Sequence, residues 1–367
     1  MTERWTKEKA WAWYNQRPWM RGCNYMSADC ANRIDQWQAL DFDKRLETTD
    51  KELALAEELG FNSIRIIVEF AVWHEEHDSF FERFDRYLDV CKKHGISCMV
   101  VLANDCMPPK YEGYEPPHVG KQKFDWGYHG GRKKSQHSIF SNLGYHPYFD
   151  EPEMRPLYFE MVREIIERYK NDERICVWDL YNEPGNSNRD SVTLPNIAEM
   201  FRVAREINPS QPLTASVWKT EGVEPSEMLE SEKFALENSD IITYHCYNDY
   251  AEQVKVISRL RALGRPLMNT EWLKRPKDNN IEDTFPLFFL EKIGSYIWGF
   301  VAGLYQTYEP HEAVWQIYEK DHDYKFDFTK WFHDLYRPNH RPYNPKETEL
   351  IHDFCVLADK EFEKNNK

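Results

Sequence analysis

Features that mark several other protein classes are missing from this sequence. No stretch approaches the roughly 18 apolar residues that a membrane span needs, and residues 1–9 carry charges where a signal peptide would need an apolar centre. Positive charge is also scarce, since 47 Lys and Arg residues face 62 Asp and Glu residues, a net charge of −15. A nucleic-acid or membrane partner would call for a clustered basic surface. We therefore expect neither partner, and a cytoplasmic location.

The cysteines lack the spacing of a metal or disulfide framework. None of the eight stands in a Cys-x-x-Cys pair, and Cys98, Cys176 and Cys246 lie inside apolar, strand-like runs. This pattern predicts buried free thiols. The segment His74-Glu-Glu-His77 is not the His-Glu-x-x-His pattern of zinc enzymes. We expect no metal and no cofactor.

What the sequence does contain is a regular alternation of short apolar runs with amphipathic segments. Eight strands are predicted, at residues 21–26, 63–70, 97–104, 175–180, 213–218, 241–247, 267–272 and 295–303. Helices are predicted after them, at residues 44–59, 80–94, 153–169, 194–207, 230–237, 252–263, 284–293 and 346–362. Eight repeats predict a single (β/α)8 TIM barrel domain over residues 1–367. An open doubly wound sheet is the competing fold, but no Gly-rich phosphate loop follows the first strand.

Two connections in this series are much longer than the usual two to six residues, which marks them as functional candidates. They are the loops after strands 3 and 8, at residues 105–150 and 304–345, and in a barrel both would open onto the catalytic face. The first carries the aromatic residues Tyr111, Tyr114, Trp126, Tyr128 and Tyr145. A Trp-rich stretch before residue 20 is expected to cap the bottom of the barrel or pack along its outside.

Two predicted strands end in a glutamate. The apolar run from Ile175, interrupted by one acid, ends at Asn182-Glu183-Pro184, where the proline blocks further strand pairing. A second run, from Pro266, ends at Glu271. The carboxyl ends of the strands are where parallel α/β folds place their chemistry, and two carboxylates there are what glycosidic bond cleavage requires.

Other predicted strand ends also carry polar or aromatic residues. Strand 2 has Arg65 and Glu69, strand 6 has His245 and Tyr247, and strand 8 has Trp298. Each alone has a structural explanation, such as a buried ion pair, a satisfied core histidine or core packing. Their occurrence together with two strand-end glutamates favours a site.

Taken in order, these motifs resemble the retaining glycoside hydrolases of clan A, most closely family 5, the cellulase-like enzymes. The resemblance covers nearly the whole chain and rests on the segments Gly60 to Arg65, Tyr181-Asn-Glu-Pro184, His245-Cys-Tyr247, Thr270-Glu-Trp272 and Trp298. An isolated Asn-Glu-Pro is a weak signal. The ordered set on the right strands is specific.

The resemblance implies a role for each matched residue. Glu183 would be the acid/base and Glu271 the nucleophile; Asn182 would meet the sugar 2-hydroxyl, Arg65 and Tyr247 would orient the nucleophile, and Trp298 would support the sugar ring. His245 and Asn104 complete the expected substrate-binding set. Family 5 enzymes usually place a histidine at the end of strand 3, where this chain has Asn104-Asp105-Cys106.

The carboxylate chemistry predicts how the pair would work. Two carboxyl groups about 5 Å apart cannot both ionise cheaply, so the pKa of one rises and it serves as acid while the other stays charged as nucleophile. We expect Arg65 to hold Glu271 ionised. The predicted function is a retaining β-glycosidase acting on an oligosaccharide or glycoside. A transglycosylase using the same residues and a non-catalytic carbohydrate-binding barrel are the alternatives, and the sequence does not fix the oligomeric state.

Overall fold

The computed structural model describes residues 3–110, 112, 114–125, 128–131 and 143–366. Its centre is an eight-stranded sheet whose neighbouring strands pair in the order β5-β4-β3-β2-β1-β8-β7-β6. The strands are β1 (Arg21–Asn24), β2 (Ser63–Ile67), β3 (Ser97–Val101), β4 (Ile175–Asn182), β5 (Leu213–Ser216), β6 (Ile242–His245), β7 (Leu267–Trp272) and β8 (Gly294–Ile297). A parallel bridge between Val217 and Tyr244 joins the two ends of the sheet. The predicted (β/α)8 barrel is confirmed.

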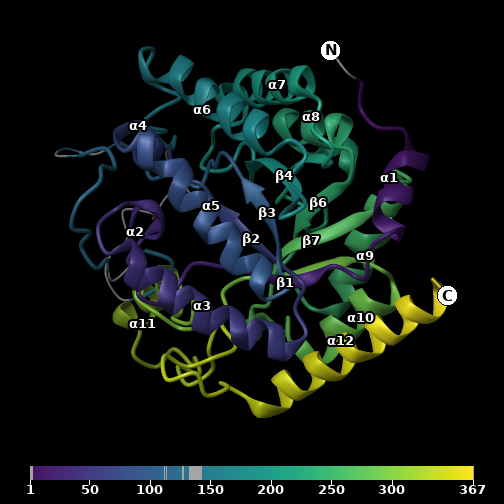
Figure 1. Cartoon of the computed structure of the whole chain (residues 1–367). Helices are drawn as coiled ribbons and strands as arrows, with labels where there is room; N and C mark the ends of the chain where they lie inside the picture. The colour runs from purple at the N-terminus through teal and green to yellow at the C-terminus, as the bar shows by residue number, and fades with distance from the viewer. Residues whose placement is uncertain (1–2, 111, 113, 126–127, 132–142, 367) are drawn as a thin grey trace.

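The helices surround the strands, and α12 runs along the outside of α3 and α10 (Figure 1). In chain order they are α1 (Lys7–Asn15), α2 (Arg33–Trp37), α3 (Phe42–Leu59), α4 (Phe70–Glu75), α5 (His77–Lys93), α6 (Met154–Tyr169), α7 (Asp190–Ile207), α8 (Glu230–Asn238), α9 (Tyr250–Arg261), α10 (Ile281–Leu290), α11 (Glu312–Lys320) and α12 (Pro345–Asn365). Helix α3 ends as predicted at Gly60, which adopts φ +88°.

Several strands end earlier than predicted. The segment predicted as strand 2 to residue 70 leaves the sheet after Ile67 and starts α4 at Phe70, and the segment predicted as strand 8 leaves it after Ile297. Both continuations stay buried, with Phe70 at 1 % and Phe300 at 0 % exposure. The apolar pattern indicates burial and not strand pairing. The predicted strands were therefore longer than the hydrogen-bonded strands of the sheet. Helices α1, α2, α4 and α11 were not predicted either.

The lower end of the barrel is closed by apolar side chains. Trp5, Trp13 and Tyr14 pack against residues from the amino-terminal parts of the strands, among them Met99, Val177, Met268 and Tyr296. The backbone N–H of Trp5 also donates to Asp240, just before β6. The Trp-rich stretch therefore forms the floor under the barrel.

All eight cysteines fall within the described residues and are free thiols, seven of them buried, as predicted. Among the described helices, none combines the length and the apolar character that crossing a bilayer would demand.

Candidate active site

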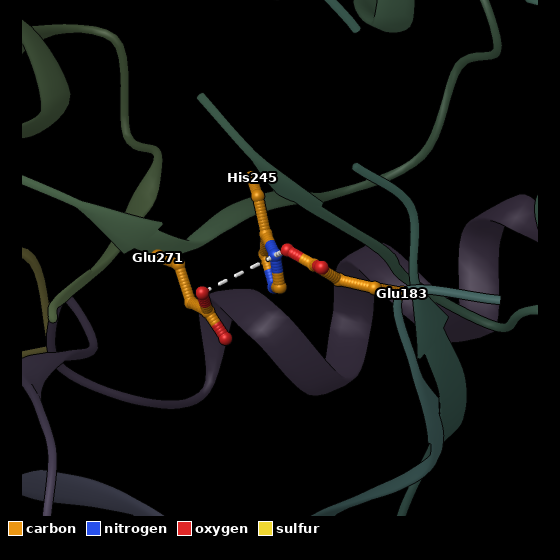
Figure 2. Close-up of side chains that lie close together, drawn as sticks. All are labelled: Glu183, His245 and Glu271. Atoms are coloured by element: carbon orange, nitrogen blue, oxygen red, sulfur yellow. Dashed lines mark hydrogen bonds and ion pairs between the residues drawn. The ribbon is translucent and has the colours of Figure 1, made fainter. Parts of the chain in front are cut away.

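Glu183 and Glu271 meet above the carboxyl ends of the strands (Figure 2). Glu183 directly follows β4, and Glu271 is the last residue but one of β7. One carboxylate oxygen of each, together with a ring nitrogen of His245, all lie within 4.8 Å of one another. The two side chains are only 12 % and 7 % exposed. This separation fits the roughly 5 Å at which one carboxylate can attack a sugar directly, with no room for an intervening water.

Glu271 is held by donors on both of its oxygens. Arg65 donates to Oε1 at 2.8 Å, and the hydroxyl of Tyr247 donates to Oε2 at 2.8 Å. Arg65 is itself fixed, because Asp179 accepts from its Nε at 3.0 Å and its Nη2 at 2.8 Å. Asn24 accepts from Nη1 of the same guanidinium. Glu271 therefore has a defined orientation.

The partners of Glu183 are of a different kind. His245 Nδ1 lies 2.7 Å from Oε1, the Cys106 thiol donates to Oε2 at 2.9 Å, and the Asn186 amide donates to the same oxygen. The residue itself has φ +49°, in the left-handed region that a side chain rarely adopts. Backbone strain of this kind is typical of functional sites. It turns the chain sharply out of β4, directly before Pro184.

The two carboxyl groups differ in pKa, in the opposite order to the expectation. Burial raises the pKa of Glu183, but hydrogen bonds from His245, Cys106 and Asn186 and the charge of His245 outweigh it, so the net pKa lies below its ordinary value. Burial raises the pKa of Glu271, and the charge of Glu183 adds to this against the opposing effects of His245, Arg65 and Tyr247. Arg65 also donates twice to the buried acid Asp179, so its charge does not act on Glu271 alone.

Asn182 and Asn104 form a pair beside this centre. The Asn182 amide donates to Asn104 Oδ1 at 2.8 Å, and Asn182 Oδ1 accepts from Arg65 at 2.6 Å. Asn104 Oδ1 also accepts from the backbone N–H of Cys106. Asn104 thus positions the Asn182 amide and the turn that carries the Cys106 thiol.

Arg189 ties the long loop after β3 to this turn. Its guanidinium donates to Asp105 at 3.0 Å, to Asp150 at 2.7 and 2.8 Å, and to the carbonyl oxygen of Gly144 at 2.7 Å. Asp105 also accepts from the backbone N–H of Gly185, just after Pro184. One buried cation therefore fixes both ends of the loop and the turn after Glu183.

Trp298 lies on the Glu271 side of the mouth, half-buried, directly after β8. The ring of His129 packs edge-on against it, with centroids 5.3 Å apart, and His129 also contacts Tyr305. The long loops after strands 3 and 8 therefore meet over this tryptophan. Tyr111 and Trp126 of the first loop lie outside the described residues. Glu69 does not reach the pair, and instead caps α4 and accepts from the Tyr148 hydroxyl at 3.3 Å.

The structure brings together the eight residues that were assigned a catalytic or substrate-binding role from the sequence, a set without Glu69: Arg65, Asn104, Asn182, Glu183, His245, Tyr247, Glu271 and Trp298. Sequence reasoning missed four further participants: Asn24, Cys106, Asp179 and Asn186. Asp179 had a signal, as the one acid inside an otherwise apolar strand. Cys106 and Asn186 had none, because their role depends on how the turns after β3 and β4 approach each other.

One grouping among the described residues has donor atoms close enough to hold a cation, and it is Glu183, His245 and Glu271 themselves. Their oxygens and nitrogen are the kinds of atom that bind a divalent metal. Three of the four carboxylate oxygens already accept a hydrogen bond from Arg65, Tyr247, Cys106 or Asn186, and the guanidinium repels a cation. The arrangement suits two interacting carboxyl groups and a shared proton.

Comparison with known proteins places this geometry in a family. The profile described as "Cellulase (glycosyl hydrolase family 5)" matches residues 27–287, well over half of the chain. A comparison with curated protein sequences finds no match.

Solved structures share the fold. The glycoside hydrolase family 5 mannosidase from Rhizomucor miehei, in complex with mannosyl-fructose, has a TM-score of 0.59 at 14 % identity, with 96 % of both chains covered. The exo-beta-1,4-mannosidase from Opitutaceae bacterium strain TAV5 has a TM-score of 0.58 at 16 % identity, over 94 % of this chain and 60 % of that one. The endo-beta-1,4-mannanase from Thermotoga petrophila has a TM-score of 0.51 at 15 % identity, over 93 % and 77 %.

The present chain spans 60 % of the length of the Opitutaceae enzyme. At these identities the likeness shows the fold, whereas the family profile covers both glutamates and the residues that contact them directly, among them Arg65, His245 and Tyr247. The resemblance found in the sequence is confirmed: this chain belongs to glycoside hydrolase family 5, the cellulase family, and is a retaining glycoside hydrolase.

Proposed function

We propose that the protein is a β-glycosidase that hydrolyses β-linked oligosaccharides or glycosides by double displacement, with Glu271 as nucleophile and Glu183 as acid/base. The observation that carries this proposal is the close approach of the two carboxyl groups, each with its own kind of donor. The eight free thiols support a reducing, cytoplasmic compartment for the reaction.

In the first step Glu271 attacks the anomeric carbon and the glycosidic bond breaks. The Arg65 and Tyr247 donors orient Glu271 and favour its charged form. The leaving oxygen takes a proton from Glu183. His245 Nδ1 lies 2.7 Å from Glu183 Oε1, so the imidazole and the carboxyl group are close enough to exchange a proton directly. The low pKa of Glu183 in the free enzyme is therefore compatible with an acid role.

The second step reverses the roles of proton donor and acceptor. Once Glu271 is esterified its charge is gone, and the repulsion it exerted on an ionised Glu183 disappears. Glu183 then accepts a proton from water, which attacks the glycosyl-enzyme and releases the sugar with its original anomeric configuration. The same intermediate would transfer its sugar to another alcohol in a transglycosylase. A non-catalytic barrel would not need two carboxyl groups this close together.

The sugar that the enzyme prefers can be identified by a screen of aryl β-glycosides. Because the solved neighbours include enzymes named as β-1,4-mannosidase and mannanase, aryl β-mannosides are the first substrates to try, followed by the glucoside, galactoside and xyloside. Proton NMR of the first product should show the β-anomer. An α-anomer as first product would exclude double displacement, and a new glycoside in place of free sugar would identify a transglycosylase.

A further inference from the structure

A cavity lies beside Glu271 at the β8-β1-β2 side of the mouth. The residues lining it include Asn24, Arg33, Arg65, His129 and Trp298. Arg65 and Asn24 belong to the Glu271 network, whereas none of the partners of Glu183 lines the cavity. Because the acid/base protonates the leaving group, the aglycone lies on the Glu183 side and the opposite side takes the glycone. This cavity is therefore on the glycone side.

Among the described residues, Arg33 and Arg65 bring guanidinium groups to this cavity, and the two differ in their hydrogen-bond partners. Arg65 is fully engaged by Glu271, Asp179, Asn24 and Asn182. The Arg33 side chain, on α2, makes no hydrogen bond or ion pair with any residue in the described part of the chain. It is only partly exposed. A guanidinium left unpaired at a partly buried position is costly unless a ligand completes it.

The Arg33 side chain lines the cavity, and its charge acts on other groups at the mouth of the barrel. It opposes the rise in pKa that burial causes at Glu69 and at the Cys106 thiol. Glu69, the nearby acid, accepts instead from the backbone N–H of Ala71 and the Tyr148 hydroxyl. Arg33 therefore faces the substrate side of the site, with its hydrogen-bonding capacity unused.

We propose that Arg33 binds a carboxylate on the glycone, so that the preferred substrates are β-glycosides of a uronic acid. This inference rests on the proposed function and names its substrate class. The planar guanidinium matches a carboxylate with two parallel hydrogen bonds. The single unpaired guanidinium of Arg33 balances one negative charge. A phosphate monoester carries a charge closer to −2 and would need a second cationic side chain. A sulfate ester shares the single charge, and the experiment separates it from a carboxylate.

The test compares matched pairs of aryl β-glycosides: glucuronide with glucoside, and galacturonide with galactoside. The wild-type protein should show the higher kcat/KM for the acid of at least one pair. Arg33→Gln should lower that preference about 10- to 100-fold, the loss expected for hydrogen bonds between charged groups. Arg33→Lys should keep part of it. The matched control is Arg86→Gln, which removes an exposed arginine on α5 that pairs with Asp43 and should not change the ratio.

The outcomes separate this inference from the function on which it rests. Turnover of neutral glycosides with an unchanged ratio in Arg33→Gln would overturn the uronic-acid assignment and leave the β-glycosidase standing. A higher kcat/KM for a 6-sulfated glucoside than for the glucuronide would also overturn it. If no glycoside were cleaved, the proposed function would fail. Binding of a carboxylate by Arg33 would then be tested by comparing the thermal shift that free glucuronate and galacturonate cause with the shift that glucose and galactose cause. Stabilisation by the acids alone, lost in Arg33→Gln, supports the inference, and equal shifts refute it.

Discussion

The two glutamates stand a few ångströms apart, yet their surroundings differ in kind. Glu271 accepts from a guanidinium and a phenol, and the guanidinium is itself fixed by buried Asp179. Glu183 accepts from a thiol and an amide and lies 2.7 Å from an imidazole nitrogen. The donors of Glu271 hold a charge in place. Those of Glu183 include groups that can exchange a proton with it, which is the difference expected under the proposed roles of nucleophile and acid/base.

The largest effect should come from removing each carboxylate in turn. Glu271→Ala should lose about 10⁴-fold or more in kcat with any glycoside, because the covalent step has no nucleophile. Glu183→Ala should still form the glycosyl-enzyme from substrates with very good leaving groups, but hydrolyse it slowly without its base. Azide should rescue Glu183→Ala and give the β-glycosyl azide. Pre-steady-state release of the aryl group and NMR of the azide product measure both steps.

Azide attack in the Glu271 variant would instead be a direct displacement and give the α-azide. Exchanged anomers, β from Glu271→Ala and α from Glu183→Ala, would mean that the two roles are reversed. Hydrolysis unaffected by either substitution would place the site elsewhere.

A smaller effect should follow from removing one hydrogen-bond donor of Glu271. Tyr247→Phe removes a donor that lowers the pKa of Glu271, so that pKa, already raised by burial, should rise further. Glu271 must be ionised to attack, and activity is lost as the pH falls through its pKa. The acid limb of kcat/KM should therefore move to higher pH, with a loss of about 10- to 100-fold at the optimum. Tyr250→Phe, at an exposed tyrosine, is the matched control; an unmoved acid limb in Tyr247→Phe would refute this role for the hydroxyl.

Replacing Trp298 tests whether the Glu271 side of the site also supports the sugar ring. Trp298→Ala should raise KM about tenfold through lost ring contact while leaving the pH profile in place, since Trp298 bonds to neither carboxylate. Thermal unfolding must be followed in parallel, because loss of packing against His129 can imitate weaker binding. A normal KM in a variant that is folded would remove Trp298 from the sugar site.

The smallest effect on activity is expected from replacing Cys106, which donates to Glu183. Its thiol helps lower the pKa of Glu183, so Cys106→Ala should raise that pKa. Because Glu183 must be protonated in the first step, activity is lost as the pH rises through its pKa, and the alkaline limb should move to higher pH by less than about one unit. Cys106→Ser keeps a donor and should restore most of the wild-type profile. Identical profiles for the alanine and serine variants would show that the hydrogen bond is without effect.

The sequence predicted the barrel and the position of both glutamates because each rests on a local pattern, an apolar run with a polar residue at its end. It did not predict where β2 and β8 stop, since Phe70 and Phe300 are as apolar and buried as strand residues. The order of the two pKa values was also out of reach. It depends on His245 lying 2.7 Å from one carboxylate and 3.5 Å from the other, and on Asp179 sharing Arg65. Such differences arise only when the strands close into a barrel.

Arg189 gives the loop after β3 an engineering consequence. The guanidinium grips Asp105 at one end of this insertion, Gly144 and Asp150 at the other, and through Asp105 steadies the turn after Glu183. A segment fastened at both ends by one internal cation can be recombined between related enzymes as a cassette. Grafts that begin after Cys106 and end before Gly144 should redirect substrate choice and leave the acid/base in register, whereas grafts that replace either anchor should cost activity toward every substrate.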